Sequence, residues 1–295
     1  MKRKLYFESY LMQRIYQFFL FLLIFTTFGY CQTESSEEKR STILESDGYV
    51  FLAEDKTISE LRDLALLNAK RNALSDAQTF IKSIVTAENY KLISDIIASK
   101  AEGSVSILEK TDFGITDDNR YHVWIKAEIT YSLNQSDFEI PGAKSTILPD
   151  SASPLTVKVW TEHEKYKSGD KVKIFIEGNK QYYAKIVYID SKGEILQLLP
   201  NRSRKDNCFE GGKTFRIPDS NDNFELEISA PFGEEKVVVY ASTEPLGDGD
   251  IEQFGDINRV RSGLNDYGLK TRGIKIKNKP AEFYESSSNV FTAEK

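Results

Sequence analysis

The sequence contains little of what builds disulfide-linked, metal-binding or catalytic proteins. It has two cysteines and two histidines in 295 residues. His122 and His163 lack the H-x-x-x-H spacing and have no cysteine beside them, so the usual zinc ligand sets are missing. The serine hydrolase motif G-x-S-x-G and the phosphate-binding motif G-x-x-x-x-G-K-[ST] are also absent. The sequence therefore predicts no catalytic residues and no cofactor.

Basic residues are not in excess. The chain has 39 Lys and Arg against 45 Asp and Glu, for a formal net charge of -6. Proteins that bind nucleic acids carry a surplus of positive charge, so no nucleic-acid partner is expected. Aromatic residues make up 12% of the chain, which is more than a disordered chain would carry. We therefore expect a globular protein.

The apolar run near the N-terminus is too short to cross a membrane. It extends over 11 residues from Phe18 to Phe28, whereas a membrane-spanning helix needs about 20. Basic residues at positions 2–4 precede it, as they do in secretory signal peptides. We therefore predict that residues 1–31 are a signal peptide. The protein is expected to be exported to the periplasm, the outer membrane or the cell surface.

Cys31 leaves two modes of cleavage open. A lipoprotein peptidase would cut before Cys31 and leave it lipidated, whereas an ordinary signal peptidase would cut before Gln32 and remove it. The residues before Cys31 depart from the bacterial lipobox, so the sequence does not choose between the two. In both cases Cys208 lacks a disulfide partner. Membrane contact is expected only through a lipid on Cys31, and residues 32–45 are predicted to form a polar tether.

The segment after this tether has the period of an amphipathic helix. Thr57 and Glu60 form a capping box, in which the hydroxyl and the carboxylate satisfy free amides at the helix start. A helix is predicted from there to about Val85. Its predicted buried side consists of Ile58, Leu61, Ala65, Ala69, Ala73, Ala77, Phe80 and Ile84. Because four of these residues are alanines, this side is expected to lie close against a sheet or another helix.

Strand patterns flank this helix. We predict a short strand at residues 49–52, a second helix at 87–99, and two alternating strands at 104–112 and 120–133. These elements together predict a small α+β domain over residues 46–138. In it, helices cover one face of an antiparallel sheet.

The pattern changes after this domain. Residues 139–152 have turn-forming composition and no periodicity, which indicates a linker. From 153 to 279 short strands alternate with turns, which predicts a β-sandwich domain. Its strands are predicted at 155–160, 171–176, 182–189, 195–199, 214–217, 224–229 and 236–243, with a short helix at 257–264 and an edge strand at 269–276. Residues 280–295 are predicted to form a loosely held tail.

A series of short motifs occurs in a fixed order in the second domain. They are Val157-Lys158-Val159-Trp160, Tyr166-x-x-Gly169-Asp170, Tyr183 to Asp190 followed by Gly193, Leu199-Pro200-Asn201, Ile217-Pro218 and Pro231-Phe232-Gly233-Glu234. With these motifs, residues 155–245 resemble an uncharacterised bacterial β-rich domain of envelope lipoproteins, receptor-like kinases and caspase-like peptidases. The resemblance implies an immunoglobulin-like sandwich that serves as an accessory module without catalytic residues.

The first domain combines Gly48-Tyr49, an alanine-rich helix over residues 64–77 and two long paired strands. In these features it is similar to the N-terminal α+β domain of flagellar assembly protein T and related lipoproteins. The similarity concerns the fold, so no flagellar role is inferred from it.

Two charged loops are candidate binding sites. The acidic loop contains Asp248, Asp250, Glu252 and Asp256. Carboxylates gathered in a loop with glycines could bind calcium, although a solvated loop has the same composition. The basic loop contains Arg202, Arg204 and Lys205. These side chains could contact an anionic polymer or the acidic face of a partner, and a solvated loop is again the alternative.

We expect a non-enzymatic envelope protein, an accessory or binding module that recognises a protein or glycan partner. This expectation depends on the signal peptide, the two modules and the missing catalytic motifs. The alternative is a periplasmic hydrolase that uses carboxylates from distant loops. A structure without a cleft that holds two carboxylates about 5 to 10 Å apart would exclude its glycosidase form.

Overall fold

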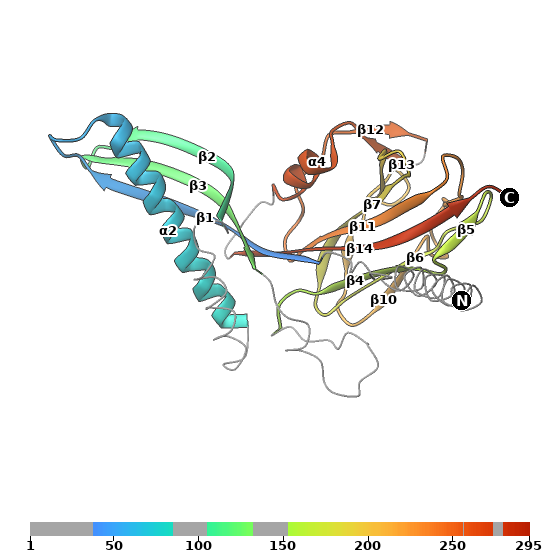
Figure 1. The fold of residues 1–295 in the computed structure, drawn as a ribbon. Helices are drawn as coiled ribbons and strands as arrows, with labels where there is room; N and C mark the ends of the chain where they lie inside the picture. Colours follow the sequence, from blue (N-terminus) through green and yellow to red (C-terminus); the bar gives the residue numbers. More distant parts are fainter. Residues whose placement is uncertain (1–37, 85–104, 132–152, 256, 274–279) are drawn as a thin grey trace, which may run out of the picture. The chain divides into compact units, whose positions relative to one another are not determined.

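The computed structural model describes residues 38–84, 105–131, 153–255, 257–273 and 280–295 (Figure 1). The strands are β1 (Lys39–Phe51), β2 (Val105–Ile115), β3 (Arg120–Tyr131), β4 (Val157–Thr161), β5 (Lys165–Lys167), β6 (Ile174–Gly178), β7 (Tyr182–Ile189), β8 (Ile195–Leu199), β9 (Cys208–Phe209), β10 (Thr214–Ile217), β11 (Glu234–Ser242), β12 (Ile251–Phe254), β13 (Ile257–Val260) and β14 (Ala281–Ala293). The helices are α2 (Ile58–Ile84) and α4 (Leu264–Thr271). The fold is α+β, with a helix on an antiparallel sheet and a β-rich, sandwich-like part. None of the helices in these residues is long and apolar enough to span a membrane.

Helix α2 covers one face of β1, β3 and β2, as the sequence predicts (Figure 1). Its start has the predicted capping box, in which the backbone N–H of Thr57 donates to Glu60 at 2.7 Å and the N–H of Glu60 donates to the Thr57 hydroxyl at 3.3 Å. The second helix predicted at 87–99 and the linker at 139–152 lie outside the described residues.

The buried side of α2 follows a spacing of four residues throughout. Its buried residues are Leu61, Ala65, Ala69, Ala73, Ala77 and Ile81. The prediction was correct for Leu61 and the alanines but wrong at both ends. Ile58 is 49% exposed, Phe80 and Ile84 are only partly buried, and Ile81 is buried instead. Rows of residues four apart are inclined to the helix axis. When a helix crosses the strands of a twisted sheet at an angle, one such row can therefore remain in contact with the sheet along the whole helix.

The polar tether predicted at residues 32–45 is wrong from residue 39 onward. Strand β1 begins at Lys39 and pairs with β3 and with β14. Ser41 and Thr42 are buried there, and the Ser41 hydroxyl donates to Glu128 at 2.6 Å. This hydrogen bond satisfies the Ser41 hydroxyl and so permits its burial. Residues 39–45 are thus polar enough to resemble a tether in sequence, although they form part of a sheet.

The sandwich is formed by a small sheet, in the order β10-β6-β4, packed on part of a large sheet. The shared core contains Val157, Ile174 and Ile176 from the small sheet and Ala184, Ile186, Val237 and Val239 from the large one. Three local predictions in this part are wrong. Residues 224–229 form only an isolated bridge between Glu227 and Lys171, residues 257–260 form β13 instead of a helix, and residues 264–271 form α4 where an edge strand was expected from 269.

The predicted loose tail is wrong, because residues 281–293 form strand β14 inside the large sheet. The order of the large sheet is β12-β13-β8-β7-β11-β14-β1-β3-β2. Strand β14 pairs with β11 along most of its length, and its first residues pair with Lys39–Ile43 of β1. The C-terminal strand thus joins the sandwich to the sheet under α2, so the two predicted domains share one strand.

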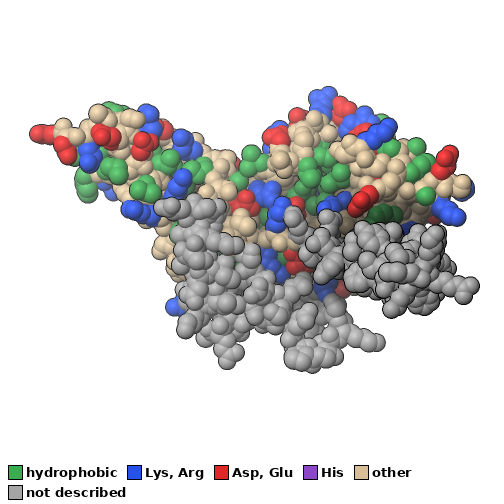
Figure 2. Space-filling view, in the orientation of Figure 1, with side chains coloured by type: hydrophobic (Ala, Val, Ile, Leu, Met, Phe, Trp, Pro, Cys, Tyr) green, Lys and Arg blue, Asp and Glu red, His purple; other side chains and the backbone are tan. Residues whose placement is uncertain are grey.

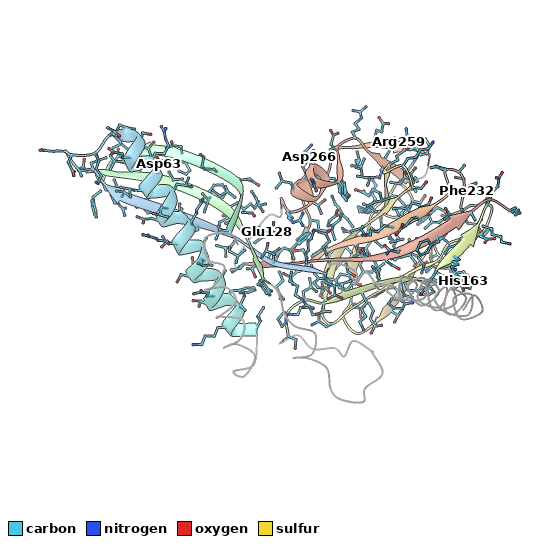
Figure 3. The ribbon with its side chains drawn as sticks, in the orientation of Figure 1. Asp63, Glu128, His163, Phe232, Arg259 and Asp266 are labelled. Carbon is cyan, nitrogen blue, oxygen red and sulfur yellow. The ribbon has the colours of Figure 1, made fainter. Side chains whose placement is uncertain are left out.

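Ion pairs and hydrogen bonds reinforce this junction. Arg272, after α4, contacts Glu128 of β3 and Glu285 of β14, each at 2.9 Å. Glu128 is labelled in Figure 3. Lys180 and Glu282 form a second pair at 2.9 Å, and both side chains are at least nine-tenths buried. Charged side chains are rarely buried unless they are paired. These ion pairs therefore connect β14 to the turn between β6 and β7 and to the segment that follows α4.

Candidate binding pocket

A pocket of about 490 Å³ is lined by residues from both sheets of the sandwich. Ligand-binding pockets usually have volumes of about 300 to 1,000 Å³. Strands β7, β8 and β11 line it from the large sheet, and β6 and residues 225–231 line it from the opposite side. Residues of β12 and β13 also border it. The sandwich therefore offers a concave site large enough for a side chain or a small molecule.

The pocket owes its shape to the segment that was predicted as a strand at 224–229. This segment runs beside residues 169–172 and makes three backbone hydrogen bonds with them, at 2.8 to 3.0 Å. It does not continue the small sheet as a regular strand, and its side chains border the pocket instead. On the other side, Leu196 and Leu198 of β8 face the pocket because residues two apart on a strand share a face.

Glu235 is the most buried charged side chain of the lining, with 4% of its surface exposed. The hydroxyl of Tyr188 donates a hydrogen bond to its carboxylate. Burial raises the pKa of Glu235 and the nearby charge of Asp190 adds to this effect, while hydrogen bonds from Tyr188, Thr292 and the Ser191 amide oppose it. Burial likewise raises the pKa of Tyr188.

The remaining charged residues of the lining are Asp190, Glu194, Glu225, Glu227 and Arg259. Arg259 of β13, which is labelled in Figure 3, contacts Glu194, and its guanidinium lies 4.1 Å from the centre of the Phe254 ring. Glu225 pairs with Lys171 at 2.6 Å. Asp190 accepts the backbone N–H groups of Lys192 and Glu194 at 2.9 and 2.8 Å. The pocket therefore has an acidic lining with a single arginine.

The three described carboxylates of the acidic loop, Asp248, Asp250 and Glu252, are not grouped to hold a metal ion. Glu252 lies in strand β12, where it pairs with Arg261 at 2.9 Å, and Asp256 lies outside the described residues. The carbonyl of Gly247 accepts a hydrogen bond from the ammonium group of Lys185 at 2.5 Å, so a cation already occupies the Gly247 side of the loop. Asp248 and Asp250 are exposed. Among the described residues, no three His, Cys, Asp or Glu side chains are grouped to hold a metal ion.

The basic loop is only partly available for binding. Arg204 contacts Asp219 at 3.2 Å and Asp222 at 3.0 Å, and its guanidinium lies 5.5 Å from the centre of the Phe209 ring. This arginine therefore holds two turns of the sandwich together. Arg202 and Lys205 are exposed. On the visible face of the molecule, acidic and basic side chains are intermixed (Figure 2).

His122, His163 and Cys208 do not line the pocket. His122 is stacked between Tyr49 and Phe113, at 4.3 and 4.6 Å between ring centres, and its Nε2 lies 2.6 Å from Asp47. Cys208 is a free, half-buried thiol that accepts a hydrogen bond from Gln181 at 3.3 Å. Cys31, the predicted lipidation site, lies outside the described residues.

The sequence did not reveal the pocket residues. Asp190 is the last residue of one motif quoted above, Tyr183 to Asp190, and Glu235 directly follows another, Pro231-Phe232-Gly233-Glu234. These positions were the available signal. Their convergence depends on the pairing of β7 with β11, which joins residues more than 40 positions apart. No local pattern encodes such pairing.

One comparison with known proteins supports the β-rich domain that the sequence predicts in the C-terminal part. No protein among the curated ones matches the chain. A family model described as "Domain of unknown function (DUF4384)" matches residues 165–245. The match includes most of the pocket lining, from Val172 to Glu235, and it confirms that the C-terminal part contains an uncharacterised β-rich domain.

Proposed function

We propose that this protein is a non-enzymatic accessory module of the cell envelope, which binds a partner protein through the pocket of its sandwich. The observation that supports this proposal is the pocket itself, which has an apolar inner wall, a buried carboxylate and an acidic rim. Concave sites with few polar groups are the usual binding sites of proteins. A glycan remains the other partner class that the sequence suggests.

The proposal that the protein is exported rests on the basic start and the short apolar run, and mass spectrometry of the mature N-terminus tests it. We expect either a lipid-modified Cys31 or a chain that starts at Gln32. A lipid mass on Cys31 would place the protein on a membrane, whereas a start at Gln32 would indicate a protein without an anchor. An intact Met1 in the cytoplasmic fraction would contradict export.

The pocket can be tested by closing it. Ser229 is an exposed residue of the lining, so a Ser229→Trp substitution places a large ring at the mouth without disturbing the core. We expect partner proteins that are chemically cross-linked to the wild-type chain in intact cells to be lost with this variant. The matched control is Ser220→Trp, because Ser220 is also exposed but does not line the pocket. Equal recovery of partners with both variants would contradict the proposal.

A hydrolase remains the second candidate, and one observation favours it. Glu235 has a raised pKa, as a general acid requires, and the charge of Asp190 acts on it. The binding proposal predicts that the chain does not hydrolyse nitrophenyl glycosides. Hydrolysis by the wild-type chain that disappears in a Glu235→Gln variant would favour the hydrolase. The similarity of the first domain to flagellar assembly protein T stays a prediction about its fold.

A further inference from the structure

The pocket combines an apolar wall with a surplus of carboxylates, and this combination indicates the chemical class of its ligand. We propose that the pocket binds a lysine or arginine side chain presented by the partner protein. This inference rests on the proposed function of the pocket as a partner-binding site. Such side chains have an aliphatic stem and a cationic end, so they match both parts of the lining.

The inner part of the pocket is suited to an aliphatic stem. It is formed by Val172, Ile174, Leu196, Leu198 and Ile228. Most of these residues also belong to the hydrophobic core of the sandwich, so the wall is held in place by packing. Each methylene group that is removed from water adds to the binding free energy, so a stem of three or four methylenes contributes a substantial part of it.

The charges of the lining favour a cation. Five carboxylates and one arginine line the pocket, and the arginine already contacts Glu194. Glu225 is paired with Lys171. Among the described side chains no ion pair neutralises Asp190, Glu227 or Glu235. An incoming ammonium or guanidinium group would therefore meet a site with excess negative charge.

Glu235 adds a buried acceptor to this site. It is 4% exposed, and Tyr188 donates to one of its carboxylate oxygens, Oε2. A carboxylate that is buried without a counter-charge loses hydration, and a cation placed beside it offsets this loss. Charge-assisted hydrogen bonds of this kind are about twice as strong as neutral ones.

Other ligand classes fit the lining less well. The carboxylates of the lining would repel an anion. Arg259, the one basic residue of the lining, already contacts Glu194 and so does not offset this repulsion. A neutral sugar would leave the charges of Asp190, Glu227 and Glu235 without a counter-ion, and the Arg259 guanidinium already occupies one face of the Phe254 ring. A protein partner that presents a basic side chain is thus the class that the lining matches in both shape and charge.

The inference can be tested with small capped amino acids on the full chain. Nuclear magnetic resonance of labelled Ile, Leu and Val methyl groups reports binding directly, since these side chains form the inner wall. We expect N-acetyl-lysine amide to shift the methyl signals of Leu196 and Leu198. Its affinity should exceed that of N-acetyl-norleucine amide, which has the same stem without the charge, by about tenfold or more.

Variants identify the carboxylate that is involved. Glu235→Gln keeps an oxygen that accepts the Tyr188 hydrogen bond but removes the charge, and we expect it to weaken binding of the lysine probe about tenfold. Glu234→Gln is the matched control, because Glu234 is exposed and does not line the pocket. Glu227→Gln changes an exposed residue of the rim, and we expect a smaller loss of about threefold.

The pH dependence provides an independent readout. The groups that face Glu235 are Tyr188, Asp190, Thr292 and the Ser191 amide, and the pKa of Glu235 is raised in the free pocket. A bound cation favours the ionised carboxylate, so binding should release protons. Affinity should therefore fall as the pH is lowered through this raised pKa. Calorimetric titrations in buffers with different ionisation enthalpies measure the released protons.

Three results would overturn the inference. Equal affinity for the norleucine and lysine probes would show that charge is not recognised, and 1,5-diaminopentane binding as tightly as the capped lysine would indicate a small polyamine instead of a protein. An absence of any methyl shift at millimolar probe concentrations would also contradict the inference. In each case the Ser229→Trp cross-linking experiment still decides the proposed function, so the two failures can be distinguished.

Discussion

Removal of residues 280–295 is expected to abolish cooperative unfolding of the whole chain. Strand β14 lies between β11 and β1 in the large sheet and also pairs with β5. It buries Phe283, Tyr284 and Val290 almost completely. Burial of three such side chains contributes about 5 to 9 kcal/mol, which is comparable to the total stability of a typical domain. Deletion also leaves two neighbouring strands with unpaired backbone groups.

Chemical denaturation followed by circular dichroism measures this effect. The matched control is a deletion of Glu294 and Lys295 only, because these residues are exposed and follow the end of β14. We expect the control to unfold like the full chain, with a change below about 0.5 kcal/mol. A cooperative transition with an unchanged midpoint after the longer deletion would mean that β14 is dispensable.

The same strand changes what is expected of separate fragments. The sequence divides the chain into domains at residues 46–138 and 153–279. A fragment of residues 153–279 lacks β14 and thus the strand between β11 and β1. A fragment of residues 46–138 lacks the part of β1 that begins at Lys39. We therefore expect neither fragment to fold as a complete unit.

Local patterns explain which parts of the fold could be predicted. Helix α2 and the hairpin of β2 and β3 were predictable, because their periodicity and capping residues lie within single segments. Strand β14 contains three consecutive serines, Ser286 to Ser288, which are typical of tails. Its position depends on pairing with β11 and β1, and the sequence of β14 alone carries no sign of these partners.

The sequence predicted the domain that contains the candidate site but not the pocket itself. The motifs around Asp190 and Glu235 marked the β-rich domain, and the match to residues 165–245 confirms that domain. The pocket itself arises because residues 225–231 do not continue the small sheet and because β8 pairs with β13. Segment 224–229 alternates apolar and polar residues like a strand, so composition could not distinguish it from one.

The backbone of α2 lies unusually close to β1 at Gly48. A Cβ atom added to Gly48 would stand 1.9 Å from the carbonyl oxygen of Ala65 and 2.5 Å from the backbone nitrogen of Ala69. Both atoms belong to the helix backbone, so no side-chain rotation can relieve the contact. The alanine stripe predicted from the sequence permits this approach, because larger side chains would hold the helix farther away.

Hydrogen bonds from the helix fix it at this distance. The side-chain amides of Asn68 and Asn72 donate to the carbonyl oxygens of Tyr49 and Asp47, each at 2.9 Å. These carbonyls flank Gly48. A helix that moved outward to accommodate a methyl group would therefore lose both hydrogen bonds in addition to its packing on the sheet.

Gly48→Ala is accordingly expected to lower the free energy of unfolding by about 3 kcal/mol or more, at the upper end of overpacking effects. Chemical denaturation with a helix-sensitive signal measures it. Gly263→Ala is the matched control, because a Cβ there meets nothing within 4 Å and the backbone φ of -64° suits any residue. Replacing glycine here reduces the entropy of the unfolded chain, whereas alanine is less favourable than glycine at the N-cap of α4. These effects oppose each other, so the control should change the free energy of unfolding by less than about 1 kcal/mol. The two substitutions add the same methyl group, and effects of equal size and sign would mean that α2 does not rest on Gly48.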